Sequence, residues 1–357
     1  MGNVTIRDVA EKAGVSTATV SNVINNRSGV SESTRNRVLQ TMRDINYRPS
    51  GTARNLKRKT GQPCIGVIVK ELNNPYYTDV ASGIREYADS KGYTVFISSS
   101  EGDHAREKVT LTQYTNKDVD GAVIAPSLLD PDAEISHLFH LQELNFPFVL
   151  LEKVRGIRSP AVDIDHVAAT KGAVKYLIDG GHSRIVHFAG PAYTSHTRER
   201  IEGVRAAYSE SHLVFNEKEN IITVGAHLED GYQAATNYFK EKNPEDYPTA
   251  IVCFNDLIAL GTVAALNDLG IDVPEQVSVI GDDDIEFAKR CPIPLTTIHT
   301  PRRELGRKAA ELLIDLIESP EDAKVRVEML ESQLVIRQSS RVLEPAAAGA
   351  GSSLNAG

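Results

Sequence analysis

The segment from Ser16 to Asn25 has residue types and spacing suited to reading DNA. Ser16 can cap a helix, and Val20, Val23 and Ile24 recur at helical spacing, so they face inward. Small uncharged residues fall on the opposite face: Thr17, Ala18, Ser21 and Asn22. Such a face can approach a major groove closely, and its polar groups can hydrogen-bond to base edges. A three-helix protein-interaction module would share this pattern and stays open as an alternative.

A run of three acids, Asp282, Asp283 and Asp284, directly follows the apolar segment 277–281. A carboxylate accepts two hydrogen bonds at once and therefore suits the neighbouring hydroxyls of a sugar or polyol. Consecutive acids could also bind a metal ion, but their side chains point in different directions and the spacing D-x-D-x-D-G is absent. We therefore expect no metal site, with ordinary loop acids as the remaining alternative.

Motifs of common enzymes are missing from the chain. It contains no G-x-G-x-x-G, no Walker-type loop, no H-E-x-x-H and no G-x-S-x-G. We therefore expect no catalytic residue, no enzyme activity and no cofactor. The three cysteines, Cys64, Cys253 and Cys291, form no C-x-x-C pair, which fits a reducing compartment.

Charge is divided unevenly along the chain. Residues 1–60 carry a formal charge of +7 and the remainder −16, which gives −9 over 357 residues. A basic head on an acidic body indicates that the head binds a polyanion, although a basic face that only aids solubility is an alternative. The first twenty residues contain no signal-like apolar run, and no stretch approaches the roughly 20 apolar residues of a membrane span. We expect a cytoplasmic protein without membrane contact.

Three short helices are predicted in the head. Thr5 can cap the first, with Asp8 at its third position, and Gly14 ends it. Ser16 opens the second helix, and Ser31 opens a third that ends before Pro49. A helix, a tight turn and a helix is the arrangement of helix-turn-helix DNA-binding domains.

From Cys64 onward, short apolar runs alternate with amphipathic stretches such as 77–91 and 135–144. The runs form two series: CIGVIV, YTVFIS, GAVIA and FVLL, then RIVHFAG, NIITV, AIVCF and VSVIG. Apolar strands alternating with helices predict parallel sheets that are covered on both faces. Two series predict two similar α/β lobes.

The head sequence TIRDVAEKAGVSTATVSNVIN, followed by VSESTRNRVLQTMRDINYRPSGTARNLK, resembles the headpiece of the LacI/GalR family of bacterial transcriptional regulators over residues 4–58. The resemblance implies that the second helix reads half of an operator, with bases chosen by Thr17, Ala18 and Asn22. The residues expected to contact DNA, including those of the hinge, are Thr5, Arg7, Ser16, Thr17, Ala18, Thr19, Ser21, Asn22, Asn25, Ser31, Thr34, Ala53, Asn55 and Leu56.

Residues 49–61 resemble the hinge helix and linker of the same family. In the family, the leucine at the position of Leu56 wedges into the minor groove at the centre of the operator and bends the duplex, which costs base stacking and gains contact area. An ordinary linker leucine is the alternative.

The resemblance extends to about Arg341 and implies a periplasmic-binding-protein-like body of two Rossmann-like lobes with a ligand between them. The expected divisions are a helix-turn-helix headpiece at 1–48, the hinge at 49–61, an effector-binding and dimerisation domain at 62–341, and a disordered tail at 342–357. Within that domain, the first lobe is expected at 62–160 and 293–323, and the second at 161–292 and 324–341.

The resemblance implies these ligand-binding residues: Tyr76, Tyr77, Ser127, Glu152, Asp165, His196, Arg200, Asn255 and Asp283. Four of them are carried over by matching position only, and a surface or hinge role is the alternative for each: Ser127, Glu152, Asp165 and His196. One of the two tyrosines is expected in the core, and Asp256 could be a helix N-cap. Arg200 is expected to be the only strong cation of the ligand pocket, although a helix-surface arginine is the alternative.

Two departures from the family pattern bear on the ligand. Ala226 lies where purine-responsive and some sugar-responsive relatives carry an aromatic platform, which disfavours a purine ligand. Asp282 lies where many members have an aromatic or apolar residue, which makes the pocket acidic and, with Arg200 as its only strong cation, favours a neutral polyol or sugar over a phosphate or carboxylate ligand.

The sequence therefore predicts a repressor that binds a roughly palindromic operator as a homodimer, because twofold symmetry in the protein is matched in its site. A small-molecule effector, expected to be a sugar, controls its affinity for the operator. The alternatives are a solute-binding or sugar-processing protein with an appended DNA-binding head.

Overall fold

The computed structural model describes residues 5–24, 29–45, 47, 62–116, 119–127, 135–321 and 325–343. The chain divides into two compact units. The first contains Met1–Asp163 and Arg302–Leu330, and the second contains Ile164–Pro301 and Glu331–Gly357. Within the described ranges, no helix is both long and apolar enough to cross a membrane.

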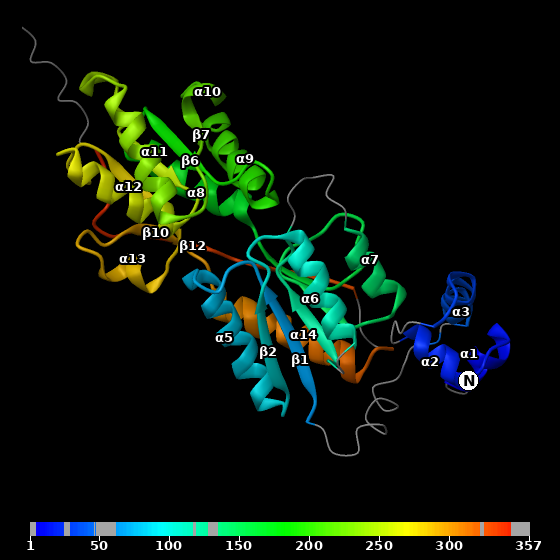
Figure 1. Cartoon of the computed structure of the whole chain (residues 1–357). Coiled ribbons are helices and arrows are strands. Elements are labelled where there is room, and N and C mark those ends of the chain that lie inside the picture. Colours follow the sequence, from blue (N-terminus) through cyan, green and yellow to red (C-terminus); the bar gives the residue numbers. More distant parts are fainter. Residues whose placement is uncertain are drawn as a thin grey trace, which may run out of the picture. The chain divides into compact units, whose positions relative to one another are not determined.

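Three helices form the head, as the sequence predicts: α1 (Ile6–Ala13), α2 (Thr17–Ile24) and α3 (Glu32–Asp44). The three helices pack against one another (Figure 1). The side chains of Val9, Val20, Val38 and Met42 are buried between them. Gly14 ends α1 at φ 63°, a left-handed conformation that favours glycine.

The body of the first unit is a six-stranded sheet with the order β11-β5-β4-β3-β1-β2. Its strands are β1 (Cys64–Val69), β2 (Thr94–Ser99), β3 (Gly121–Ile124), β4 (Phe148–Leu150), β5 (Ala161–Ile164) and β11 (Val327–Leu330). The ladders that join β1 to β5 are parallel. All six residues of β1 are buried, which explains its uninterrupted apolar sequence.

Four helices accompany this sheet: α5 (Pro75–Ser90), α6 (His104–Asn116), α7 (Ser136–Glu143) and α14 (Arg302–Glu318). Helices α5 and α14 lie side by side although they are far apart in the sequence (Figure 1). Two glycines permit this approach. A Cβ at Gly306 would lie 2.0 Å from the Val80 carbonyl oxygen, and one at Gly83 would lie 2.1 Å from that of Arg303.

The second unit contains another six-stranded sheet, with the order β12-β10-β9-β8-β6-β7. Its strands are β6 (Ile185–Ala189), β7 (Ile221–Thr223), β8 (Ala250–Cys253), β9 (Ser278–Asp283), β10 (Thr296–His299) and β12 (Gln333–Val335), of which β12 runs antiparallel to β10. Its helical elements are α8 (His166–Asp179), α9 (Ser195–Ser209), α10 (Glu217–Asn220), α11 (Leu228–Lys240), η1 (Pro244–Asp246), α12 (Asp256–Asp268) and α13 (Glu286–Arg290). The predicted α/β class with two parallel-sheet lobes is confirmed.

Two of the three predicted chain crossings need correction. The chain leaves the first unit after Asp163, close to the predicted position near 160, but it returns at Arg302 and leaves again after Leu330, later than the predicted positions near 292 and 324. The second crossing is late because β10 pairs with β9 in the second sheet. The third is late because β11 belongs to the first sheet.

The predicted start of the tail at residue 342 is also too early. The backbone N–H of Leu343 donates to the Gly180 carbonyl at 2.8 Å, so residues 342 and 343 belong to the second unit. Residues 344–357, the remainder of the predicted tail, lie outside the described residues.

Candidate DNA-binding and effector-binding sites

Helix α2 presents the uncharged face that the sequence predicts. The Ser16 hydroxyl accepts a hydrogen bond from the backbone N–H of Thr19 at 3.0 Å, so Ser16 caps the helix start. Thr17 and Ala18 are exposed, and Ser21 and Asn22 are half-buried, whereas Val20 and Val23 are buried on the opposite side. The face therefore consists of small side chains on a helix whose apolar side is held by α1 and α3.

The other described residues of the predicted DNA-binding set lie at or near helix starts. The Asp8 carboxylate accepts hydrogen bonds from the backbone N–H and the hydroxyl of Thr5, which lowers the pKa of Asp8 and fixes the start of α1. Ser31 accepts from the backbone N–H of Thr34 at the start of α3, and Arg7 is exposed on α1. The remaining predictions, Asn25, Ala53, Asn55 and Leu56, lie outside the described residues.

An ion pair between a half-buried lysine and a buried glutamate lies at the carboxyl ends of two strands in the first unit. Lys70 follows β1, Glu152 lies just beyond β4, and the ammonium contacts the carboxylate at 3.0 Å. Burial alone would lower the pKa of Lys70, but the negative charge of the Glu152 carboxylate and its hydrogen bond hold that pKa above its ordinary value. Glu152 was predicted from family position and Lys70 was not. Lys70 is therefore a cation near a strand end of the first unit that sequence reasoning did not single out, and the expectation that Arg200 is the only strong cation of the pocket stays a prediction.

Ser127, another predicted ligand residue, lies in a buried polar chain of the first unit. Its hydroxyl hydrogen-bonds to that of Ser100 at 2.7 Å, and its backbone N–H donates to Glu107 at 2.6 Å. The other carboxylate oxygen of Glu107 lies 2.6 Å from Nε2 of His137. The loop after β3 is thus fixed by a buried carboxylate on α6 that sequence reasoning did not single out.

Tyr76 and Tyr77 lie in the first turn of α5, as predicted. Their rings meet edge to face with centroids 5.1 Å apart, and both are half-buried. The expectation that one of them is a core residue is therefore wrong. An edge-to-face pair leaves ring surface that can pack against the apolar face of a sugar.

In the second unit, Arg200 is buried and paired rather than exposed on its helix. It projects from α9, and its Nε donates to the Asp282 carboxylate at 2.8 Å. The guanidinium also lies over the Phe254 ring, 4.5 Å from the ring centroid. The alternative of a helix-surface arginine does not hold.

The acid run does not converge on one point. Asp282 binds Arg200, whereas Asp284 accepts from Arg337 at 2.5 Å and from Nδ1 of His299 at 2.8 Å. Burial would raise the pKa of Asp284, but these two donors hold it below its ordinary value. Asp283 lies between them at φ 121°, a strained conformation for a residue with a side chain, and such strain clusters at functional sites.

Asn255 is the N-cap of α12, so the expectation that Asp256 could fill this position is wrong. The Asn255 side chain accepts from the backbone N–H of Ile258 at 2.8 Å and donates to the Ala226 carbonyl at 2.9 Å. Asp256 is fully buried and accepts from the backbone N–H of Ile285 and the hydroxyl of Thr297. Burial raises the pKa of Asp256 to about 7.

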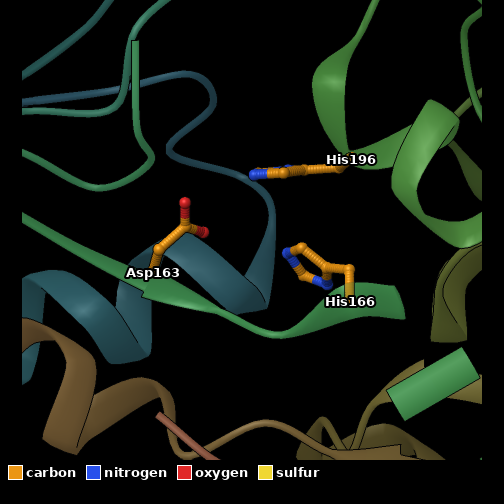
Figure 2. Close-up of side chains that lie close together, drawn as sticks. All are labelled: Asp163, His166 and His196. Carbon is orange, nitrogen blue, oxygen red and sulfur yellow. The ribbon is translucent and has the colours of Figure 1, made fainter. Parts of the chain in front are cut away.

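Two imidazoles of the second unit, His166 and His196, face each other with ring centroids 4.5 Å apart (Figure 2). His196 was predicted as a ligand residue, and His166 was not. Asp165, also predicted, is exposed and accepts from the backbone N–H of Ala168, which makes it the N-cap of α8. Asp163, also drawn in Figure 2, lies at the end of β5 and accepts from the backbone N–H of Lys153 at 3.0 Å.

The missed residues had only a weak signal in the sequence. Lys70 directly follows a buried strand, and His166 starts a helix directly after another, where side chains reach the carboxyl edge of a parallel sheet. Strand position alone does not separate them from ordinary loop residues.

Comparison with known proteins agrees with this architecture. Residues 5–50 match the model described as "Bacterial regulatory proteins, lacI family", and residues 174–340 match "Periplasmic binding protein-like domain". The HTH-type transcriptional repressor PurR of Photobacterium profundum is 37% identical over 342 residues, which cover 95% of this chain and 99% of that repressor. The chain belongs to the LacI family.

Two solved LacI-family structures share its fold over nearly the whole chain. The lac repressor dimer bound to operator and the anti-inducer ONPF has a TM-score of 0.70 at 28% identity, covering 95% of this chain and 100% of that chain. The transcriptional regulator CelR in complex with cellobiose has a TM-score of 0.68 at 28% identity, covering 94% and 100%.

This chain is therefore a DNA-binding transcriptional repressor of the LacI family, and its relatives are repressors rather than enzymes. Regulators of this family bind operator DNA and a small-molecule effector and act as dimers.

Proposed function

We propose that this repressor binds a roughly palindromic operator as a homodimer through α2, and that a neutral sugar or polyol controls its affinity for the operator. The exposed, uncharged face of α2 carries the DNA-reading half of the proposal, because small polar groups on a supported helix can reach base edges. Leu56 and the rest of the hinge are proposed to contact the minor groove, on the family resemblance alone. Because a bacterial repressor acts on the chromosome, we propose a cytoplasmic location for the protein.

Buried polar residues near strand ends support the effector half of the proposal. In the second unit these are Arg200, Asn255 and Asp283, and in the first unit Ser127 and Glu152, all of them largely buried. They have protein partners, and their donors and acceptors near the carboxyl edge of each sheet are of the kinds that hydrogen-bond to hydroxyl groups, which supports a ligand with many hydroxyls. The proposed set of effector-binding residues also includes Tyr76, Tyr77, Asp165 and His196.

A sugar is favoured by two observations. The related CelR structure contains cellobiose. In this chain Ala226 offers only a methyl group at the position where purine-responsive relatives carry an aromatic platform, and its carbonyl is bound by Asn255. A relative at 37% identity carries the name PurR, so a purine base is the competing probe in the experiment.

The test is selection of bound duplexes from a random DNA library, with no addition, with a mixed sugar pool and with a pool of purine bases. We expect a palindrome whose enrichment differs between the no-addition and sugar arms. The Asn22→Ala variant should change the preferred bases, whereas Asn36→Ala, the same substitution at an exposed position on α3, should not. A palindrome that responds only to purines would overturn the sugar proposal, and no enrichment under any condition would overturn the DNA-reading proposal.

Coupling gives a second check once the sugar is identified. Because binding free energies are reciprocal, operator must change the affinity for the sugar by the same factor that the sugar changes the affinity for operator. Equal sugar affinity with and without operator would contradict the proposed control.

A further inference from the structure

The buried pair of Arg200 and Asp282 has a consequence for the kind of ligand that the second unit accepts. The two side chains are only 5% and 2% exposed, and Nε of the arginine donates to the carboxylate at 2.8 Å. Charges that are removed from water are weakly screened, so one carboxylate this close largely cancels the field of the guanidinium. Arg200 thus presents hydrogen-bond donors to a ligand without presenting a net positive charge.

The position of the guanidinium is also fixed by its surroundings. It lies over the Phe254 ring, and that ring has room only because residue 190 is glycine: a Cβ there would lie 2.6 Å from two atoms of the ring. The arginine therefore rests on an aromatic ring and is held from one edge by Asp282. It cannot turn away from the carboxylate without losing both contacts.

Neighbouring groups do not restore a positive charge. His187 on β6 is completely buried, and burial together with the nearby Arg200 lowers the pKa of its imidazole to about 4, so the ring is neutral at physiological pH. Asp283, the next residue after Asp282, adds a further carboxyl group. The cations Arg337 and Lys289 are engaged by Asp284.

We infer that Asp282 determines the charge selectivity of the effector site in the second unit: by neutralising Arg200 it makes the site accept neutral polyhydroxylated ligands and reject anionic ones. This inference rests on the proposed effector function of Arg200 and names the residue that restricts its ligand class. Removing the carboxylate while keeping the shape should convert the site into one that binds anions through Arg200, since a guanidinium fork matches the oxygens of a phosphate or carboxylate.

The test uses inorganic phosphate as the probe and the full-length chain, and it needs neither operator nor sugar. Thermal unfolding of the wild type and of Asp282→Asn is followed against phosphate concentration, with chloride at matched ionic strength as the reference. Asp268→Asn is the matched control, because it removes the same charge from the same unit at a residue that binds Tyr232 instead of an arginine. We expect Asp282→Asn to bind phosphate at least 10-fold more tightly than the wild type and Asp268→Asn do.

The double variant Asp282→Asn/Arg200→Gln should lose the gained binding, because the proposed anion ligand is the guanidinium. Equal phosphate dependence in the wild type and Asp282→Asn would overturn the inference, as would binding that survives in the double variant. Should Asp282→Asn fold in neither salt while the double variant folds, an anion cannot take the place of Asp282, and the inference is again wrong. A positive phosphate result together with a failed operator selection would reject the proposed function while leaving the charge selectivity of Asp282 in place.

Discussion

His187 should make the second unit lose stability in acid. Its Nδ1 lies 2.8 Å from the Val252 carbonyl, and burial lowers the pKa of its imidazole from 6.5 to about 4. Between pH 6.5 and pH 4 the imidazole of His187 is protonated in the unfolded chain but not in the folded chain. Its contribution to the free energy of unfolding is therefore fully present above pH 6.5 and is lost as the pH falls toward 4. A shift of this size corresponds to about 3 kcal/mol in total and to about 2 kcal/mol at pH 5.

Substitution of His187 by Asn isolates this contribution, because the amide keeps an N–H donor for the Val252 carbonyl and does not titrate. Urea unfolding of both proteins is measured at pH 7.5 and pH 5. We expect the wild type to lose about 2 kcal/mol more than the variant between these pH values. The raised pKa of Asp256 acts in the opposite direction, since its contribution is lost as the pH rises through about 7, but it is common to both proteins and cancels in the comparison. Equal losses of unfolding free energy in the wild type and the variant would refute the assignment of this acid sensitivity to His187.

Three further changes test other parts of the molecule. Leu56→Ala should weaken binding to the selected operator much more than binding to random DNA, because a minor-groove wedge acts through DNA deformation. Filter binding measures the affinity for both DNAs, and equal losses of affinity would contradict the wedge. Asp283→Asn should abolish the response to the effector and leave ligand-free operator binding near normal, whereas loss of both in the same binding assay would assign Asp283 a structural role. Gly190→Ala should lower stability in thermal unfolding by about 1–3 kcal/mol, because the new Cβ overlaps the Phe254 ring, whereas Gly172→Ala, where nothing lies within 4 Å, should not; equal effects would argue against the close packing.

Periodicity and turn chemistry predicted most of the fold because they report on local forces. Ser16 and Ser31 cap the helices they were expected to open, and continuous apolar runs such as Cys64–Val69 became fully buried strands. The strands next to the points where the chain crosses between the two units were predicted poorly: β11 was not predicted, and β10 was assigned to the first lobe instead of the second. Thr296–His299 is rich in threonine, and its membership of the second sheet depends on its pairing with β9, which no local pattern reports.

The candidate site was predicted less completely than the fold. Family position identified Arg200 and Asp283, but it could not say that Arg200 would be bound by Asp282, because the pairing depends on how α9 and β9 pack. Tyr76 and Tyr77 were correctly placed at a helix start, whereas their burial depended on neighbours that the sequence does not specify. Partner choice among buried charges is a property of tertiary packing and could not be obtained from residue types alone.

The three crossings of the chain also determine the order in which the protein can be completed during its synthesis. The sheet of the first unit begins with β1, but its last strand, β11, and the helix α14 that packs on α5 are translated only after almost all of the second unit. Until α14 has been made, the surface of α5 around Gly83, against which α14 packs closely, is uncovered and its apolar side chains are exposed. The first unit therefore cannot mature on the ribosome ahead of the second, and a message truncated before residue 302 would yield a DNA-binding head on an unfinished, aggregation-prone body rather than a free-standing competitor for the operator.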